Sequence, residues 1–249
     1  PLMNSADLRT SGYEISFSWR DQIDLGGKPF GYSISANISD NKTIITKYDN
    51  PERTFAKDYY EGMELGEIWG FVTDGLFMSD AEAQAYAQQV DLSYITTRLT
   101  GGWLGGDLKY VDQNGDGVVN SDDQVFLGKG GWYGNPLTVG ANLTLKYKSF
   151  TLFALGTAGM GAYGLKNSSY YWIDDQDKYS AVVRDRWTPE TAATATYPRL
   201  TVTEGANNFV TSDFWMYSTK RLDLAKVQLT YDLPSAVLAN NKVIKGFSA

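Results

Sequence analysis

The sequence predicts an all-β protein, an antiparallel transmembrane β-barrel segment with long loops. Two observations lead to this fold class. Apolar and polar residues alternate over about ten residues at a time, and short connections alternate with very long ones. In the first alternating stretch one face carries Tyr13, Ile15, Phe17 and Trp19. Strands of this length, apolar on one face and polar on the other, are typical of membrane barrels, whereas strands of soluble β-sandwiches are nearer five or six residues long.

The alternation predicts about six strands. Proline cannot donate to a strand ladder, so Pro234 ends the fifth of them. The predicted ranges are 11–20, 30–39, 137–148, 150–156, 215–233 and the start of a sixth at 243–247.

The connections differ sharply in length. Residues 24–28 and Lys148-Ser149 are short turns, whereas 41–135 and 159–213 are long loops. Loops beyond about 15 residues are uncommon in compact domains unless they are functional. Outer-membrane barrels place short turns on the periplasmic side and long loops outside, so both long loops are expected to be extracellular.

A short surface helix is predicted inside the first loop. Ser79 and Glu82 have the spacing of a capping box, in which each side chain bonds a free amide at the helix start. The helix is expected to continue to about Gln89, and nothing in it indicates chemistry.

Composition narrows the possible functions. The 249 residues include no Cys and no His, which excludes disulfide scaffolds, thiolate or imidazole metal sites and His-based catalysis. A net charge of −7 argues against nucleic acid as a partner. The sequence contains no run of 18 apolar residues, so it predicts no transmembrane helix. No signal peptide is visible at the start, so an exported protein is expected to be present here in mature form or as a fragment.

An acidic turn in the first long loop predicts a calcium site. Residues 112–123, DQNGDGVVNSDD, place oxygen ligands at positions 1, 3, 5, 7, 9 and 12 of a calcium-type loop, with Gly117 at the turn position. The predicted ligands are Asp112, Asn114, Asp116, the Val118 carbonyl, Asn120 and Asp123. Because Asp replaces the usual Glu at position 12, we expect structural Ca²⁺ in the ~10⁻⁴–10⁻³ M affinity range. Mg²⁺ and an ion-free turn are the alternatives.

Five phrases, in order, are similar to the SusC/RagA family of TonB-dependent outer-membrane transporters. Together they span almost the whole chain. They are GEIWGFVTDGLF at 66–77, GDLKYVDQNGDGVV at 106–119, YPRL at 197–200, SDFWMY at 212–217 and VQLTYDLP at 227–234. One departure lies at Asp223 and Lys226, where the family tends to have a basic residue and Asn, which leaves the register of the last strand open.

This resemblance implies a barrel of about 22 strands around an N-terminal plug. It also implies a TonB box and a SusD-like surface lipoprotein that covers the pore. Neither plug nor TonB box is recognisable in the sequence. The chain is therefore expected to be a late barrel segment in outer-membrane lipid, importing an oligosaccharide or peptide without covalent chemistry.

Loop aromatics are the candidate cargo contacts, because exposed rings stack on sugars. The candidates are Trp103, Trp132, Tyr170, Tyr171 and Trp172. For any one of them, packing within the loops or against the lipoprotein is the simpler interpretation.

Two other functions stay open. A secreted calcium-binding β-sandwich module of a carbohydrate-active protein would also show alternating strands. A glycosidase would need a fixed carboxylate pair, for which Asp174-Asp175 is the candidate.

Overall fold

The computed structural model describes residues 6–50, 59–96, 101–130, 135–173, 180–201 and 206–234. Its contacts divide the chain into two compact units. The strand unit consists of Thr10–Thr43, Tyr133–Ala162 and Thr219–Ala249, and the loop unit of Pro1–Arg9, Ile44–Trp132 and Tyr163–Ser218. Among the described residues, no helix is both long and apolar enough to cross a membrane.

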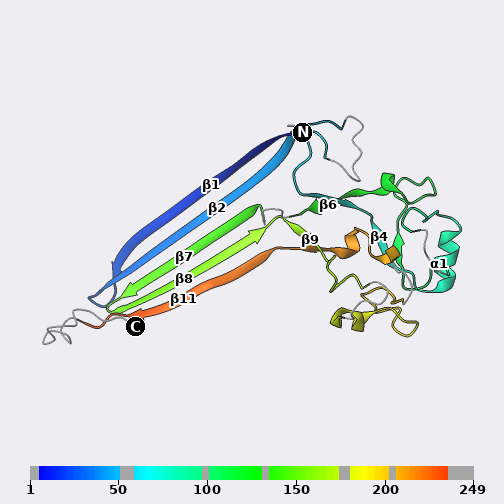
Figure 1. Cartoon of the computed structure of the whole chain (residues 1–249). Coiled ribbons are helices and arrows are strands. Elements are labelled where there is room, and N and C mark those ends of the chain that lie inside the picture. Colours follow the sequence, from blue (N-terminus) through cyan, green and yellow to red (C-terminus); the bar gives the residue numbers. More distant parts are fainter. Residues whose placement is uncertain are drawn as a thin grey trace. The chain divides into compact units, whose positions relative to one another are not determined.

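One five-stranded antiparallel sheet confirms the predicted fold class (Figure 1). Its strand order is β1-β2-β7-β8-β11. The strands are β1 (Ala6–Asp24), β2 (Pro29–Tyr48), β7 (Leu137–Tyr147), β8 (Phe150–Met160) and β11 (Arg221–Tyr231). The first two are about twice as long as predicted. The predicted sixth strand at 243–247 lies outside the described residues.

The register puts the predicted apolar residues on one face of the sheet. Ile34 of β2 is opposite Leu143 of β7, which is opposite Ala154 of β8 and then Val227 of β11. Near the short turns, the row that runs across the strands is aromatic instead: Phe30, Tyr147, Phe150 and Tyr231. The Phe30 and Tyr147 ring centroids are 6.3 Å apart, and those of Phe150 and Tyr231 are 4.8 Å apart. The face therefore has an apolar band with an aromatic border, as in membrane barrels.

A β-bulge resolves the register of the last strand. The pairing of β11 with β8 shifts between Leu224, opposite Gly156, and Lys226, opposite Leu155. Ala225 is the extra residue, so the apolar positions change from even numbers before it to odd numbers after it while keeping the same face. Asp223 and Lys226, where the sequence departs from the SusC/RagA pattern, lie on either side of this bulge.

The predicted fifth strand was wrong at its start. Trp215 ends a 3₁₀ turn, η4 (Asp213–Trp215), and β10 (Met216–Ser218) pairs with β9 (Tyr163–Leu165) in the loop unit. β11 begins only at Arg221. The buried Trp215 ring, 2% exposed, belongs to the core of the loop unit.

The loop unit packs both predicted long loops around one aromatic core. Its remaining elements are β3 (Glu67–Gly70), β4 (Thr73–Leu76), α1 (Asp80–Ala87), β5 (Leu108–Tyr110), η1 (Ser121–Asp123), β6 (Val125–Lys129), η2 (Ala181–Asp185) and η3 (Ala206–Asn208). β3 pairs with β6 and β4 with β5. The core combines Phe71, Phe77, Trp103 and Tyr110 of the first loop with Tyr197 and Trp215 that follow later in the chain. Most of these rings meet edge to face, the favoured geometry of aromatic pairs.

The helix begins where the sequence predicts. The Ser79 hydroxyl accepts the Glu82 amide at 3.2 Å, and the Glu82 carboxylate accepts the Met78 amide at 2.8 Å, one residue before the expected partner. Ala83 is fully buried, so one side of α1 packs on the core.

We predict that deletion of Ala225 in the full-length protein disrupts the pairing of β8 with β11. Without the extra residue, either Leu222 and Leu224 or Val227 and Leu229 must turn to the polar face. Ala225→Ser, which keeps the residue count, is the control. Limited proteolysis should cut the deletion variant within β11 and spare the control; equal protection of both would contradict the assigned bulge.

Candidate functional site

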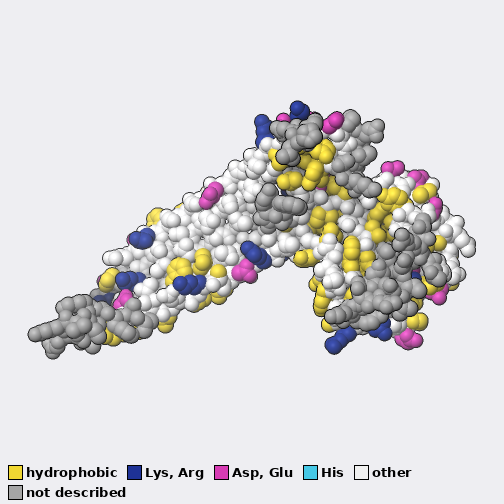
Figure 2. Space-filling model, in the orientation of Figure 1, with side chains coloured by type: hydrophobic (Ala, Val, Ile, Leu, Met, Phe, Trp, Pro, Cys, Tyr) yellow, Lys and Arg dark blue, Asp and Glu magenta, His cyan; other side chains and the backbone are white. Residues whose placement is uncertain are grey.

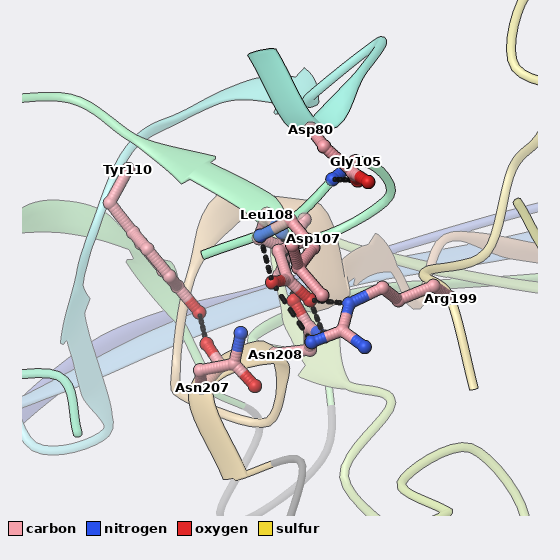
Figure 3. A network of polar contacts seen from close by, with 9 residues as sticks. Asp80, Gly105, Asp107, Leu108, Tyr110, Arg199, Asn207 and Asn208 are labelled. Carbon is pink, nitrogen blue, oxygen red and sulfur yellow. Dashed lines mark hydrogen bonds and ion pairs between the residues drawn. The ribbon is translucent and has the colours of Figure 1, made fainter. Parts of the chain in front are cut away.

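A buried carboxylate joins the two predicted loops (Figure 3). The Arg199 guanidinium donates to both oxygens of Asp107, at 2.7 and 3.2 Å. The Asn208 side-chain amide donates to the same carboxylate at 2.9 Å, and the Leu104 backbone amide donates at 3.0 Å. Asp107 is fully buried, and such a charge needs this many donors to offset its desolvation.

The backbone of the two loops is joined at the same place. The Leu108 amide donates to the Asn208 side-chain oxygen at 2.8 Å, and the Arg199 amide donates to the Gly106 carbonyl at 2.9 Å. Gly106 has φ of 84°, and a Cβ there would lie 2.7 Å from the Trp187 ring. Glycine is therefore required at this position, both for its backbone conformation and for the indole packed on it.

Two tyrosines of the loop unit stay neutral: Tyr110 bonds across the junction, and Tyr197 bonds within the second loop. The Tyr110 hydroxyl donates to the Asn207 carbonyl at 2.6 Å, and the Tyr197 hydroxyl donates to the Tyr171 carbonyl at 2.7 Å. Burial, followed by the nearby Asp107 charge, raises the pKa of Tyr110 well above its usual value. Burial raises the pKa of Tyr197 to about 12. Both hydroxyls thus act as donors throughout the physiological range.

The predicted calcium ligands lie in one loop held by side chain–backbone bonds. Asp112 accepts the Gly115 and Gly117 amides at 2.7 and 2.8 Å. Asn114 accepts the amide of Asp116 at 2.8 Å, and Asp116 accepts the amide of Val118 at 2.8 Å.

The end of the loop is closed by a fully buried carboxylate. Asp123 accepts the amides of Gln113 at 2.7 Å and Asn120 at 2.8 Å, so it ties the two ends together. Among the residues that the structure describes, no three Asp or Glu side chains converge in a geometry that could hold a metal. The calcium site thus stays a prediction.

The five aromatic candidates occupy different environments. Trp103 is in the core, 7% exposed, and Trp172 packs against the same core. Tyr170 is 50% exposed and meets Tyr171 edge to face at 5.0 Å. Trp132 lies outside the described residues, as does the Asp174-Asp175 pair. Of the four candidates that the structure describes, Tyr170 is the exposed one, whereas Tyr171 packs partly buried against the core, as Trp172 does.

Sequence reasoning missed the residues that organise this unit. Asp107, Arg199 and Asn208 carry the junction, but none of them was predicted as a site residue. Asp107 and Arg199 occur in the phrases at 106–119 and 197–200 that are similar to the SusC/RagA family. Asp107 and Arg199 are 92 residues apart in the sequence. A periodic pattern within one strand or helix cannot predict a contact over that separation.

We predict that Asp107→Asn destabilises the loop unit by about 3–5 kcal/mol, because it removes the fully buried charge that the half-buried Arg199 guanidinium pairs with. Urea unfolding of the full-length protein, followed by Trp fluorescence, measures the change. Asp223→Asn is the control, since its pairing with Arg221 is exposed, and it should cost at most about 1 kcal/mol. Similar midpoints for both variants would contradict the role of Asp107.

Known proteins are similar to this chain in sequence and in fold. No family model matches the chain. It is 32% identical over 138 residues to TonB-dependent receptor P26 of Formosa agariphila, covering 52% of this chain and 13% of that protein. In fold it is similar to the RagAB peptide importer in its open-open state (TM-score 0.60, 18% identity, 98% of this chain and 24% of that one) and in its closed-closed state (TM-score 0.59, 17% identity, 96% and 25%).

The chain thus spans about a quarter of the RagAB chains and a smaller part of the receptor. The predicted resemblance to the SusC/RagA type of TonB-dependent transporter is confirmed, in sequence for half of the chain and in fold for nearly all of it.

Proposed function

We propose that this chain forms part of the wall and the external loops of a transporter in the bacterial outer membrane. That transporter would import an oligosaccharide or peptide, powered through TonB, with a SusD-like lipoprotein over the pore. The proposal rests on the five-stranded sheet, which has one apolar and one polar face. Its exposed large apolar residues range from 44% for Ile34 of β2 to 84% for Leu222 of β11, as side chains solvated by lipid would be.

This exposure also weighs against the secreted β-sandwich. A sandwich buries the apolar face of each sheet against a second sheet. In the strand unit, the described apolar side chains of β1 and β11 have no such cover. The relatives named above are a receptor and importers, which supports a non-enzymatic role for the wall.

Growth and fractionation of the source organism test the transport role. Deletion of the full-length gene should abolish growth on a peptide or on an oligosaccharide as sole nutrient, and complementation should restore it. The protein should fractionate with the outer membrane. Recovery of the full-length protein as a monodisperse soluble monomer, folded with calcium and without detergent, would contradict the proposal and favour the sandwich module.

We also propose that residues 112–123 bind a structural Ca²⁺ through the predicted ligands. The donor set supports this, because it consists of the hard oxygens that Ca²⁺ prefers. Hydrogen bonds, first from the Gly117 amide, lower the pKa of Asp112, so it remains ionised. Each carboxylate oxygen that accepts one amide keeps a second lone pair for a cation.

The acidic loop is connected directly to the core. Val119 within it is fully buried, and its amide donates to the Asp91 carbonyl at 2.9 Å. The Asp91 amide in turn donates to the Gly117 carbonyl at 2.8 Å. An ion bound only by the folded loop would therefore stabilise the whole loop unit by mass action.

We predict that Ca²⁺ raises the Tm of the EDTA-treated full-length protein in detergent, with an apparent Kd of ~10⁻⁴–10⁻³ M. Asp112→Asn should weaken binding at least about tenfold, since it replaces a charged ligand. Asp122→Asn, an acid of the same loop outside the predicted set, should leave Kd unchanged. No Tm change at saturating Ca²⁺, or equal weakening in both variants, would refute the site.

A further inference from the structure

The polar face of the strand unit contains a shallow basic hollow near the short turns. It measures about 500 Å³ and lies over β1, β2 and β7. The polar-face residues that line it are Arg20, Gln22, Gly31, Ser33, Thr144 and Lys146. On the side shown in Figure 2, few hydrophobic side chains lie on the elongated strand region, and its basic and acidic groups are scattered.

The strand register explains the hollow. Lys146 of β7 is opposite Gly31 of β2, and Thr144 is opposite Ser33. The Ser18 hydroxyl donates to the Ser35 hydroxyl at 3.1 Å, which sets Arg20 of β1 opposite Ser33. Arg20 and Lys146 are thus diagonal across β2. The missing side chain at Gly31 and the small Ser33 leave open space between them.

Neither cation of the hollow, Arg20 or Lys146, is paired with a carboxylate among the residues that the structure describes. Asp21 lies beside the hollow, but its carboxylate accepts the Gln22 amide at 2.8 Å and the Tyr32 hydroxyl at 3.4 Å. Strand alternation also points Asp21 to the face opposite Arg20.

We propose that this hollow binds the carboxylate of an acidic side chain from another part of the same protein. A guanidinium fork, an ammonium and neighbouring hydroxyls are the donors that a carboxylate accepts. This inference goes beyond the transport role and does not depend on the cargo.

The exposure of the hollow favours a tethered carboxylate over a free anion. Each exposed ion pair shifts an equilibrium only by roughly two- to five-fold, so a free carboxylate would be held weakly. A group on the same chain has an effective concentration of the order of mM. Since this chain spans about a quarter of the RagAB chains, most of a protein of that length would lie outside residues 1–249 and could supply it.

Zero-length cross-linking of the full-length protein tests the proposal. A carbodiimide activates a carboxylate and joins it to a nearby lysine Nζ as an amide, while the reagent takes up the water that is lost. Mass spectrometry should find the Lys146 peptide linked to an Asp or Glu peptide outside residues 1–249. The yield should fall severalfold at about 1 M salt, where screening acts within about 3 Å.

Two variants separate the hollow from general charge effects. Arg20→Gln should lower the Lys146 cross-link by roughly two- to five-fold, the effect of one exposed pair. Lys28→Gln removes the same charge from the nearby turn and should leave the yield unchanged. The salt series on the unsubstituted protein decides the matter if Arg20→Gln fails to fold.

Two outcomes would overturn the proposal: links from Lys146 only within residues 1–249 or none at all, or a yield insensitive to salt. Loss of uptake in the growth experiment has no bearing on these results.

Discussion

The buried carboxylate of Asp107 is the constraint on which the loop unit depends. A charge removed from water costs several kcal/mol unless donors surround it, and its donors come from distant segments, above all Arg199 and Asn208. The first long loop can therefore bury Asp107 only if the second folds onto it. Formation of that contact also brings the two halves of the aromatic core together, because Tyr110 and Trp215 both bond the backbone beside Asn208.

The strand unit follows a different rule, and the sequence specifies it well. Period-2 alternation fixes which face each residue takes, so four of the five described strands were predicted near their positions. In β11 the apolar positions change from even to odd residue numbers. The spacing of Leu222, Leu224 and Val227 shows this change once Ala225 is counted as one extra residue. The strand lengths were underestimated, because polar residues such as Asn41 and Lys42 continue the ladder of β2 without a clear apolar pattern.

The loop unit could not be predicted to the same degree. Its helix start and acidic turn are local patterns, and the sequence showed both. Its core is assembled from side chains about 100 residues apart, as for Leu108 and Asn208, and no local period reports such a contact. This explains why Trp103, a candidate for cargo by composition, is instead part of the core. It also explains why Trp215 was assigned to a sheet strand although it packs among the loops.

Amide hydrogen exchange on the full-length protein most directly tests the claim that the two loops form one cooperative unit. The informative amides are those of Phe71, Leu108 and Arg199, which bond acceptors in the other loop segment. If the loops open together, these amides will show the same opening free energy, as members of one cooperative unit do. Clearly different opening free energies for the three amides would show that the contacts between the loops open separately, and this result would contradict the account.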